Sequence, residues 1–136
     1  MSDVDVAEES VLVFEEGIPG FPGSRRFALV NVADDSAFQL LQSLDEPDVA
    51  MIVTVPWLFF PEYAPELSEL ERRELQLEGK EDAVIFSAVT LDADQSTISL
   101  NLLGPFVVNA KTRRGRQVVL ADSGYPVRAT ATLVDA

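Results

Sequence analysis

Carboxylates are the side chains of this sequence best suited to chemistry, because histidine and cysteine are both absent. Without them the chain lacks the commonest general base, the commonest transition-metal ligand and every nucleophile that needs a thiolate or a histidine. A pair of carboxylates with separated pKa values, as in glycosidases, is the one catalytic arrangement that the composition allows. The acids fall in turns, in the N-terminal tail and in one predicted helix, and their spacing singles out no such pair. We therefore expect the protein not to be an enzyme, with a carboxylate-dependent hydrolase as a remote alternative.

Three short motifs invite comparison with ligand sites. The stretch from Asp45 to Asp48 lacks the ladder of oxygen ligands of a calcium loop and predicts a turn. Asp92 and Asp94 also lie in a predicted turn, with no histidine and no third acid nearby. The glycine-rich stretch 15–23 has no Lys-Ser/Thr pair for phosphate, whereas its Pro19-Gly20 fits the centre of a type II turn. The sequence thus predicts no metal and no cofactor.

A basic cluster opposes the overall charge of the chain, which has 23 acidic and 10 basic side chains and a net charge of −13. The cluster consists of Lys111, Arg113, Arg114 and Arg116. It suits an acidic partner segment or a carboxyl terminus, and equally a hairpin tip that its charges keep soluble. A weaker alternative is a nucleic-acid-binding barrel whose arginines track phosphates, because so negative a body repels a phosphate backbone.

An aromatic run between two prolines, Trp57 to Tyr63, holds the only tryptophan and two phenylalanines, Phe59 and Phe60. Neighbouring side chains of a strand point to opposite faces, so one face cannot hide all these rings. Part of the run should be accessible to a partner. The alternative is that Trp57 and Phe59 face the core while Leu58 and Phe60 fill a second cluster under a loop.

The stretch 97–120 predicts a core hairpin around which the domain is organised. Residues 97–102 alternate strictly between polar and apolar, as in a half-buried strand, and Gly104-Pro105 interrupts the run. A second strand is expected to begin at Phe106, and Gly115 to supply a positive φ in the basic tip. We expect 118–120 to form the return strand.

Further strands and one helix complete the prediction. Ser68 and Glu71 form a capping box that begins a helix over 69–77, with Gly79 ending it. About eight or nine strands, with turns every 8 to 12 residues, indicate a mainly β fold: a single antiparallel β-barrel-like domain (or a sandwich) over 11–136 with one short helix. A flexible acidic tail is expected over 1–10. Since no apolar segment approaches the roughly 20 residues of a membrane helix and the N-terminus is acidic, we expect a cytoplasmic protein without membrane contact. The remaining predicted strands are 11–14, 27–32, 38–43, 51–55, 83–91 and 125–134.

Several ordered blocks between Val11 and Arg128 resemble the flagellar assembly factor FliW family. Two departures are a shortened, acidic region before Val11 and Gly104, which stands where the family usually has alanine. The blocks are Glu16-Gly17-Ile18-Pro19-Gly20-Phe21, Leu41-Gln42-Ser43, Phe59-Phe60-Pro61-Glu62-Tyr63, Glu66-Leu67-Ser68, Val89-Thr90 and Asn101 to Asn109, with Arg114 and Gln117.

The resemblance implies a non-enzymatic regulator with two protein partners. Proteins similar to FliW bind the translational repressor CsrA and, alternatively, flagellin. Flagellin in the cytosol holds the factor; once flagellin is secreted, the freed factor binds CsrA away from its RNA-contacting surface, and CsrA releases the flagellin message. Because aromatic anchors and arginines dominate interfaces, we expect the partner-binding groups to lie among Phe59, Phe60, Tyr63, Asn101, Asn109, Arg113 and Arg114.

Overall fold

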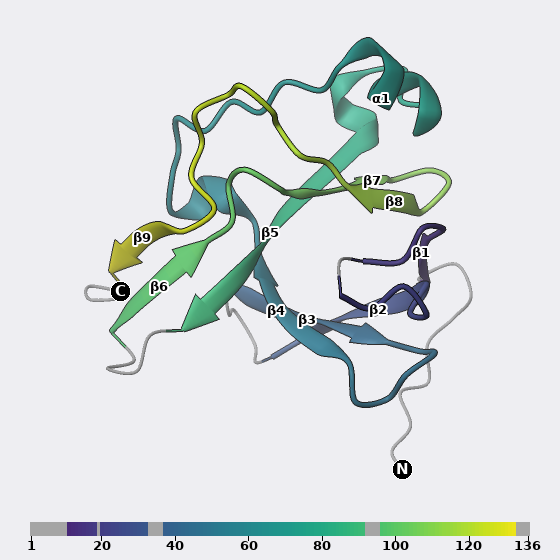
Figure 1. The fold of residues 1–136 in the computed structure, drawn as a ribbon, viewed down its shortest axis with the longest axis horizontal. Helices are drawn as coiled ribbons and strands as arrows, with labels where there is room; N and C mark the ends of the chain where they lie inside the picture. The colour runs from purple at the N-terminus through teal and green to yellow at the C-terminus, as the bar shows by residue number, and fades with distance from the viewer. Residues whose placement is uncertain (1–10, 19, 33–36, 92–95, 133–136) are drawn as a thin grey trace.

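The computed structural model describes residues 11–18, 20–32, 37–91 and 96–132. Within these ranges it contains nine strands, the α-helix α1 (Glu69–Glu74) and two 3-10 helices, η2 (Pro56–Leu58) and η3 (Lys80–Asp82). This confirms the predicted mainly β fold with one short helix (Figure 1). The strands are β1 (Leu12–Phe14), β2 (Arg26–Asn31), β3 (Phe38–Ser43), β4 (Ala50–Thr54), β5 (Ala83–Leu91), β6 (Thr97–Leu100), β7 (Phe106–Asn109), β8 (Arg114–Gln117) and β9 (Ala129–Thr132).

Seven strands close into a ring. Their order is β4-β3-β2-β1-β8-β7-β5, and the pairs Val53 with Ala88 and Thr54 with Ser87 join β5 back to β4. The neighbours are antiparallel except β1 and β8, which run parallel. Ring closure is what permits so small a sheet to bury an interior without exposing both of its edges.

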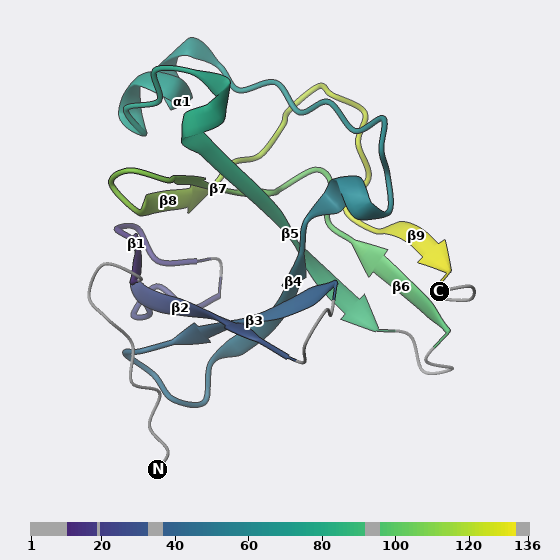
Figure 2. The same cartoon turned by 180° about the vertical axis from the view of Figure 1, so that it is seen from behind.

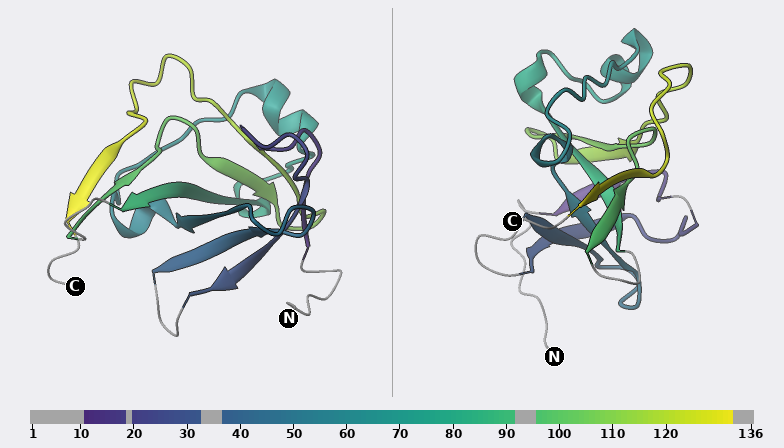
Figure 3. Two further views of the ribbon diagram at one scale, coloured as in Figure 1. Left: turned by 60° about the horizontal axis from the view of Figure 1, so that its bottom comes forward. Right: turned by 90° about the vertical axis from the view of Figure 1, so that its left-hand side faces the viewer.

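The motif Asn101 to Pro105 interrupts what would otherwise be one strand. β6 pairs with the C-terminal part of β5 and β7 with its N-terminal part, so both lie along one edge of β5 instead of pairing with each other. Gly104-Pro105 thus breaks the strand as predicted. β9 then adds to β6, and both project from the side of the ring farthest from β1 and β2 (Figures 2 and 3).

The domain has two apolar clusters, one on each side of the β7 strand. Phe106 and Val108 pack into the interior of the ring, where Phe14 and Phe27 contact edge to face at 5.4 Å. Val107 points to the outer cluster, which the loops 55–82 and 118–128 cover. All four residues of β7 are therefore buried. The outer cluster explains why so many rings of the 57–63 run are sheltered.

The predicted hairpin is wrong in its second half. The return strand is the polar β8, whereas 118–120 lie after it. The positive φ belongs to Arg113, at 62°, and not to Gly115. A Cβ on Gly115 would stand 2.7 Å from the carbonyl oxygen of Val107, so glycine is needed there for close strand approach.

Strands β1, β2 and β4 differ from their predicted bounds by one residue at one or both ends, and two other element boundaries differ by three residues or more. The capping box of Ser68 and Glu71 begins α1, as expected, but the helix ends at Glu74 because Gln76 takes the left-handed conformation at φ 60°, ahead of Gly79. The last strand starts at Ala129 and not at Tyr125, since Pro126 accepts from the loop 102–103 instead. The predicted tail 1–10 and the turn with Asp92 and Asp94 lie outside the described residues, and the extent of the single domain stays a prediction.

Candidate partner-binding surfaces

The aromatic run folds over the outside of the barrel and divides into buried and exposed rings. After β4, η2 turns the chain because Pro56 begins it, and its carbonyl accepts from the backbone N–H groups of Phe59 and Phe60. Phe59 and Phe60 are half-buried against the outer cluster, and Phe59 stacks on Phe38 with centroids 5.9 Å apart. Part of the run is accessible, as predicted, but its exposed large apolar side chains are those of Trp57 and Leu58.

Tyr63 is a core residue, with only 5% of its surface exposed. Its hydroxyl donates to the carbonyl oxygen of Leu102 at 2.7 Å, and its ring meets that of Tyr125 edge to face at 4.8 Å. Burial raises the pKa of Tyr63 well above its usual value. Tyr125 in turn accepts from the backbone N–H of Ala64. Tyr63 therefore joins the two covering loops to the interrupted strand and offers little surface to a partner.

The two asparagines of the candidate set also bond within the chain. Asn101 uses its Oδ1 to accept from the N–H of Gly104 at 2.8 Å, which shapes the interruption between β6 and β7. Asn109 is 2% exposed. Its Nδ2 donates to the carbonyls of Leu75 and Gln76, which follow α1, and its Oδ1 accepts from two backbone N–H groups of the hairpin tip. Asn109 thus fixes the hairpin to the end of the helix.

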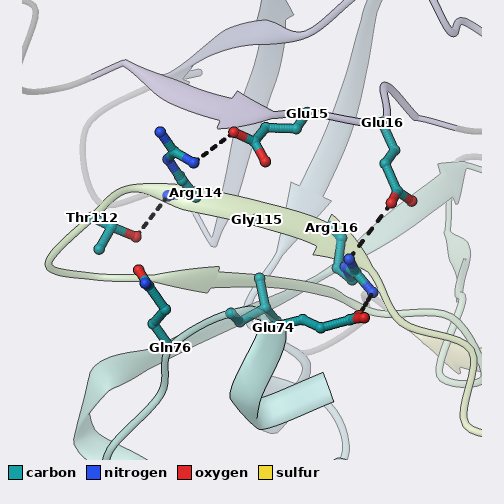
Figure 4. Close-up of a pocket in the computed structure, with 9 residues that line it drawn as sticks. Glu15, Glu16, Glu74, Gln76, Thr112, Arg114, Gly115 and Arg116 are labelled. Carbon is teal, nitrogen blue, oxygen red and sulfur yellow. Dashed lines mark hydrogen bonds and ion pairs between the residues drawn. The ribbon is translucent and has the colours of Figure 1, made fainter. Parts of the chain in front are cut away.

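The basic cluster is largely neutralised by carboxylates of the same chain. Arg114 lies 2.6 Å from Glu15, and Arg116 lies 2.7 Å from Glu74 and 3.6 Å from Glu16 (Figure 4). Among the described residues Arg113 has no ion pair, and its guanidinium donates to the carbonyl of Lys111. The sequence did not reveal these pairs because the carboxylates lie in the turn after β1 and at the end of α1, which are remote along the chain.

Lys111 closes the other side of the hairpin tip. Its Nζ lies 3.3 Å from Asp82 and 3.9 Å from Glu78. The backbone N–H of Glu78 donates to Asp82 and, with Lys111, holds the pKa of that carboxyl below its ordinary value. Ion pairs with acidic side chains therefore hold the hairpin 106–117 on both of its sides.

A cavity of about 140 Å³ opens between the end of β1, the end of α1 and β8. Three glutamates, two arginines, Gln76 and Thr112 line it, so its walls carry one net negative charge when all are ionised. Each of the three glutamates forms an ion pair with one of the arginines, as Figure 4 shows. The cavity therefore lies where ion pairs connect β8 to the end of α1 and to the turn after β1.

The remaining candidate ligand motifs have internal roles as well. Asp45 accepts from the backbone N–H groups of Arg26 and Arg25, and these bonds lower its pKa. In the glycine-rich stretch the N–H of Phe21 donates to the carbonyl of Ile18, and Gly20 has a φ of 87°, as a type II turn requires. Within the described residues no group of three acids is placed to hold a metal ion, and no helix there is long and apolar enough to cross a bilayer.

The fold and these contacts define a class: a small closed β-barrel in which Tyr63, Asn101, Asn109, Lys111, Arg114 and Arg116 bond within the chain. Comparison with known proteins makes the assignment specific. The family model described as FliW protein matches residues 1–131. This chain belongs to the FliW family, and membership supports a role in flagellar assembly.

Individual relatives and a solved structure agree with the family assignment. The flagellar assembly factor FliW of Clostridium botulinum (strain Alaska E43 / Type E3) is 33% identical over 126 residues, covering 93% of this chain and 89% of the relative. The one of Exiguobacterium sp. (strain ATCC BAA-1283 / AT1b) is 38% identical over 125 residues, covering 92% and 86%. A crystal structure of the flagellar assembly factor FliW superposes with a TM-score of 0.86 at 29% identity, covering 94% of this chain and 89% of that one.

Proposed function

We propose that this protein is a non-enzymatic cytoplasmic regulator that binds the translational repressor CsrA and, alternatively, flagellin. While flagellin is plentiful it occupies the protein. When flagellin leaves the cell, the free protein binds CsrA and lifts its repression of flagellin mRNA. The two binding events are coupled because a copy of this protein that is bound to one partner is not available to the other.

The observation that carries this proposal is that three of the four cations of the basic hairpin are neutralised by acids of the same chain. Lys111, Arg114 and Arg116 are each paired with acids of the same chain. The hairpin therefore adds little positive field to a body with a net charge of −13. Such a body repels RNA and, docked on an RNA-binding repressor, makes RNA binding to that repressor less favourable.

In this proposal the candidate partner-binding residues fall into two groups, those that reach the surface and those buried beneath it. Phe59, Phe60, Arg113 and Arg114 reach the surface and are proposed to contact a partner directly, as is the half-buried Asn101. Tyr63 and Asn109 are proposed to act indirectly, because their hydrogen bonds hold the covering loops and the hairpin in place.

Calorimetric titration with purified components tests the proposal. CsrA and flagellin should each bind the protein, and flagellin added first should reduce the apparent affinity for CsrA. Absence of binding by both proteins would refute it.

A second titration addresses the nucleic-acid alternative, with a single-stranded RNA at low salt. We expect no binding. Tight binding that weakens steeply with salt would instead favour the nucleic-acid-binding barrel.

A further inference from the structure

An exposed apolar ridge follows β4 on the outside of the barrel. It consists of Val55, Trp57 and Leu58, which are 42%, 36% and 61% exposed. In the described part of the chain, the other exposed large apolar side chains are at least seven positions apart. Single exposed apolar side chains are normal on a protein surface, whereas three of them within four residues are unusual.

The ridge is rigid although it is exposed. Leu58 donates its backbone N–H to the carbonyl of Val55, which closes the turn of η2. The indole Nε1 of Trp57 donates to the carbonyl of Tyr63 at 2.7 Å, and the two rings lie 5.7 Å apart. Because Tyr63 is itself held in the core, the indole is fixed with one part open to solvent. A surface ordered in advance loses little entropy when a partner docks.

The charged residues that flank the ridge along the chain are acidic. Between Arg26 and Arg72 the sequence holds nine acidic residues and no basic one. Glu62, which directly precedes the residue that anchors the indole, is exposed, as is Glu66. In the described ranges neither forms an ion pair within the chain. An occupant of the ridge therefore meets apolar groups and unpaired carboxylates together.

We propose that the ridge is the docking surface for a partner segment that carries aliphatic side chains beside lysine or arginine. The aliphatic groups cover Trp57 and Leu58, and the cations meet Glu62 and Glu66. Nucleic acid and anionic membranes lack the positive charge that this surface requires. The inference rests on the proposed function, since it assigns one of the two protein partners to a particular surface.

Trp57 gives a local probe because it is the only tryptophan of the chain. The protein labelled with 5-fluorotryptophan is titrated with purified CsrA and, separately, with purified flagellin, and the ¹⁹F resonance is followed. Binding at the ridge shifts this resonance for one of them. Leu58→Ala should then weaken the affinity for that partner about tenfold, and Glu62→Gln should reduce the salt dependence of binding.

Leu70→Ala is the matched control, since Leu70 lies on α1 and is 58% exposed. It should leave both affinities unchanged. Urea midpoints of Leu58→Ala and Leu70→Ala should equal that of the unsubstituted protein, because both side chains are exposed.

Two results overturn the inference alone. One is that at least one of CsrA and flagellin binds, but neither moves the resonance on binding and neither loses affinity for Leu58→Ala. The other is that a uridine-rich single-stranded RNA moves the resonance at low salt. If neither protein binds the unsubstituted chain, the proposed function fails, and the inference falls with it.

Discussion

Replacing Asn109 by alanine should destabilise the fold strongly, although sequence analysis placed this residue among the partner-binding groups. Its side chain makes four hydrogen bonds: two to carbonyls after α1 and two from the hairpin tip. The bond to Leu75 is buried, and losing it leaves a buried carbonyl unsatisfied, at a cost of about 1–3 kcal/mol. The other three are partly solvated, so each adds about 0.5 kcal/mol. The expected loss is about 3 kcal/mol.

Urea unfolding followed by circular dichroism measures this loss. With a slope of about 2 kcal/mol per molar urea, the midpoint should fall by about 1.5 M. The control is Asn31→Ala: Asn31 is exposed and accepts a single bond from Gln39, so it should change stability by less than about 0.5 kcal/mol. If Asn109→Ala unfolds at the same urea concentration as this control, the assigned structural role of Asn109 is wrong.

Three further substitutions test other parts of the fold. Gly115→Ala would bring a Cβ within 2.7 Å of the backbone of Val107, so thermal unfolding should show a loss of about 1–3 kcal/mol; an unchanged melting temperature would contradict the close approach. Asp45 has a lowered pKa because backbone N–H groups bond its ionised form, so its stabilising effect is complete above the ordinary value of 3.8 and is lost as pH falls below it. Asp45→Asn should therefore unfold more readily than the unsubstituted protein near neutral pH, with the difference shrinking towards about pH 3; a gap that widens in acid would argue against this. Arg116→Ala should cost about 1 kcal/mol or less at low salt, and denaturation at about 1 M NaCl should remove most of that cost, since the ion pairs with Glu74 and Glu16 are partly exposed; a loss independent of salt would indicate packing instead.

The local elements of this protein were predictable because short-range rules determine them. β3 and β5 have the predicted bounds, since alternating or β-branched residues between turn signals leave few alternatives. The capping box at Ser68 was predictable for the same reason, because both of its bonds join residues three apart.

Contacts between remote segments were not predictable from one sequence. The arginines of the hairpin seemed available because their partners, Glu15 and Glu74, come from other elements. Tyr63 seemed a surface ring because periodicity reports one buried face per strand, whereas this barrel buries a second cluster outside its wall. The family resemblance added identity that the residue patterns alone did not contain, and the family match confirmed it.

The central claim is that this FliW-family protein acts by binding other polypeptides, and release of RNA from CsrA tests it most directly. Purified CsrA is bound to the leader of flagellin mRNA, and the protein is added while the bound fraction is measured by mobility shift. The account predicts that the RNA is released, that the protein itself does not shift bare RNA, and that added flagellin restores the CsrA–RNA complex. A CsrA–RNA complex that persists at saturating protein would contradict it.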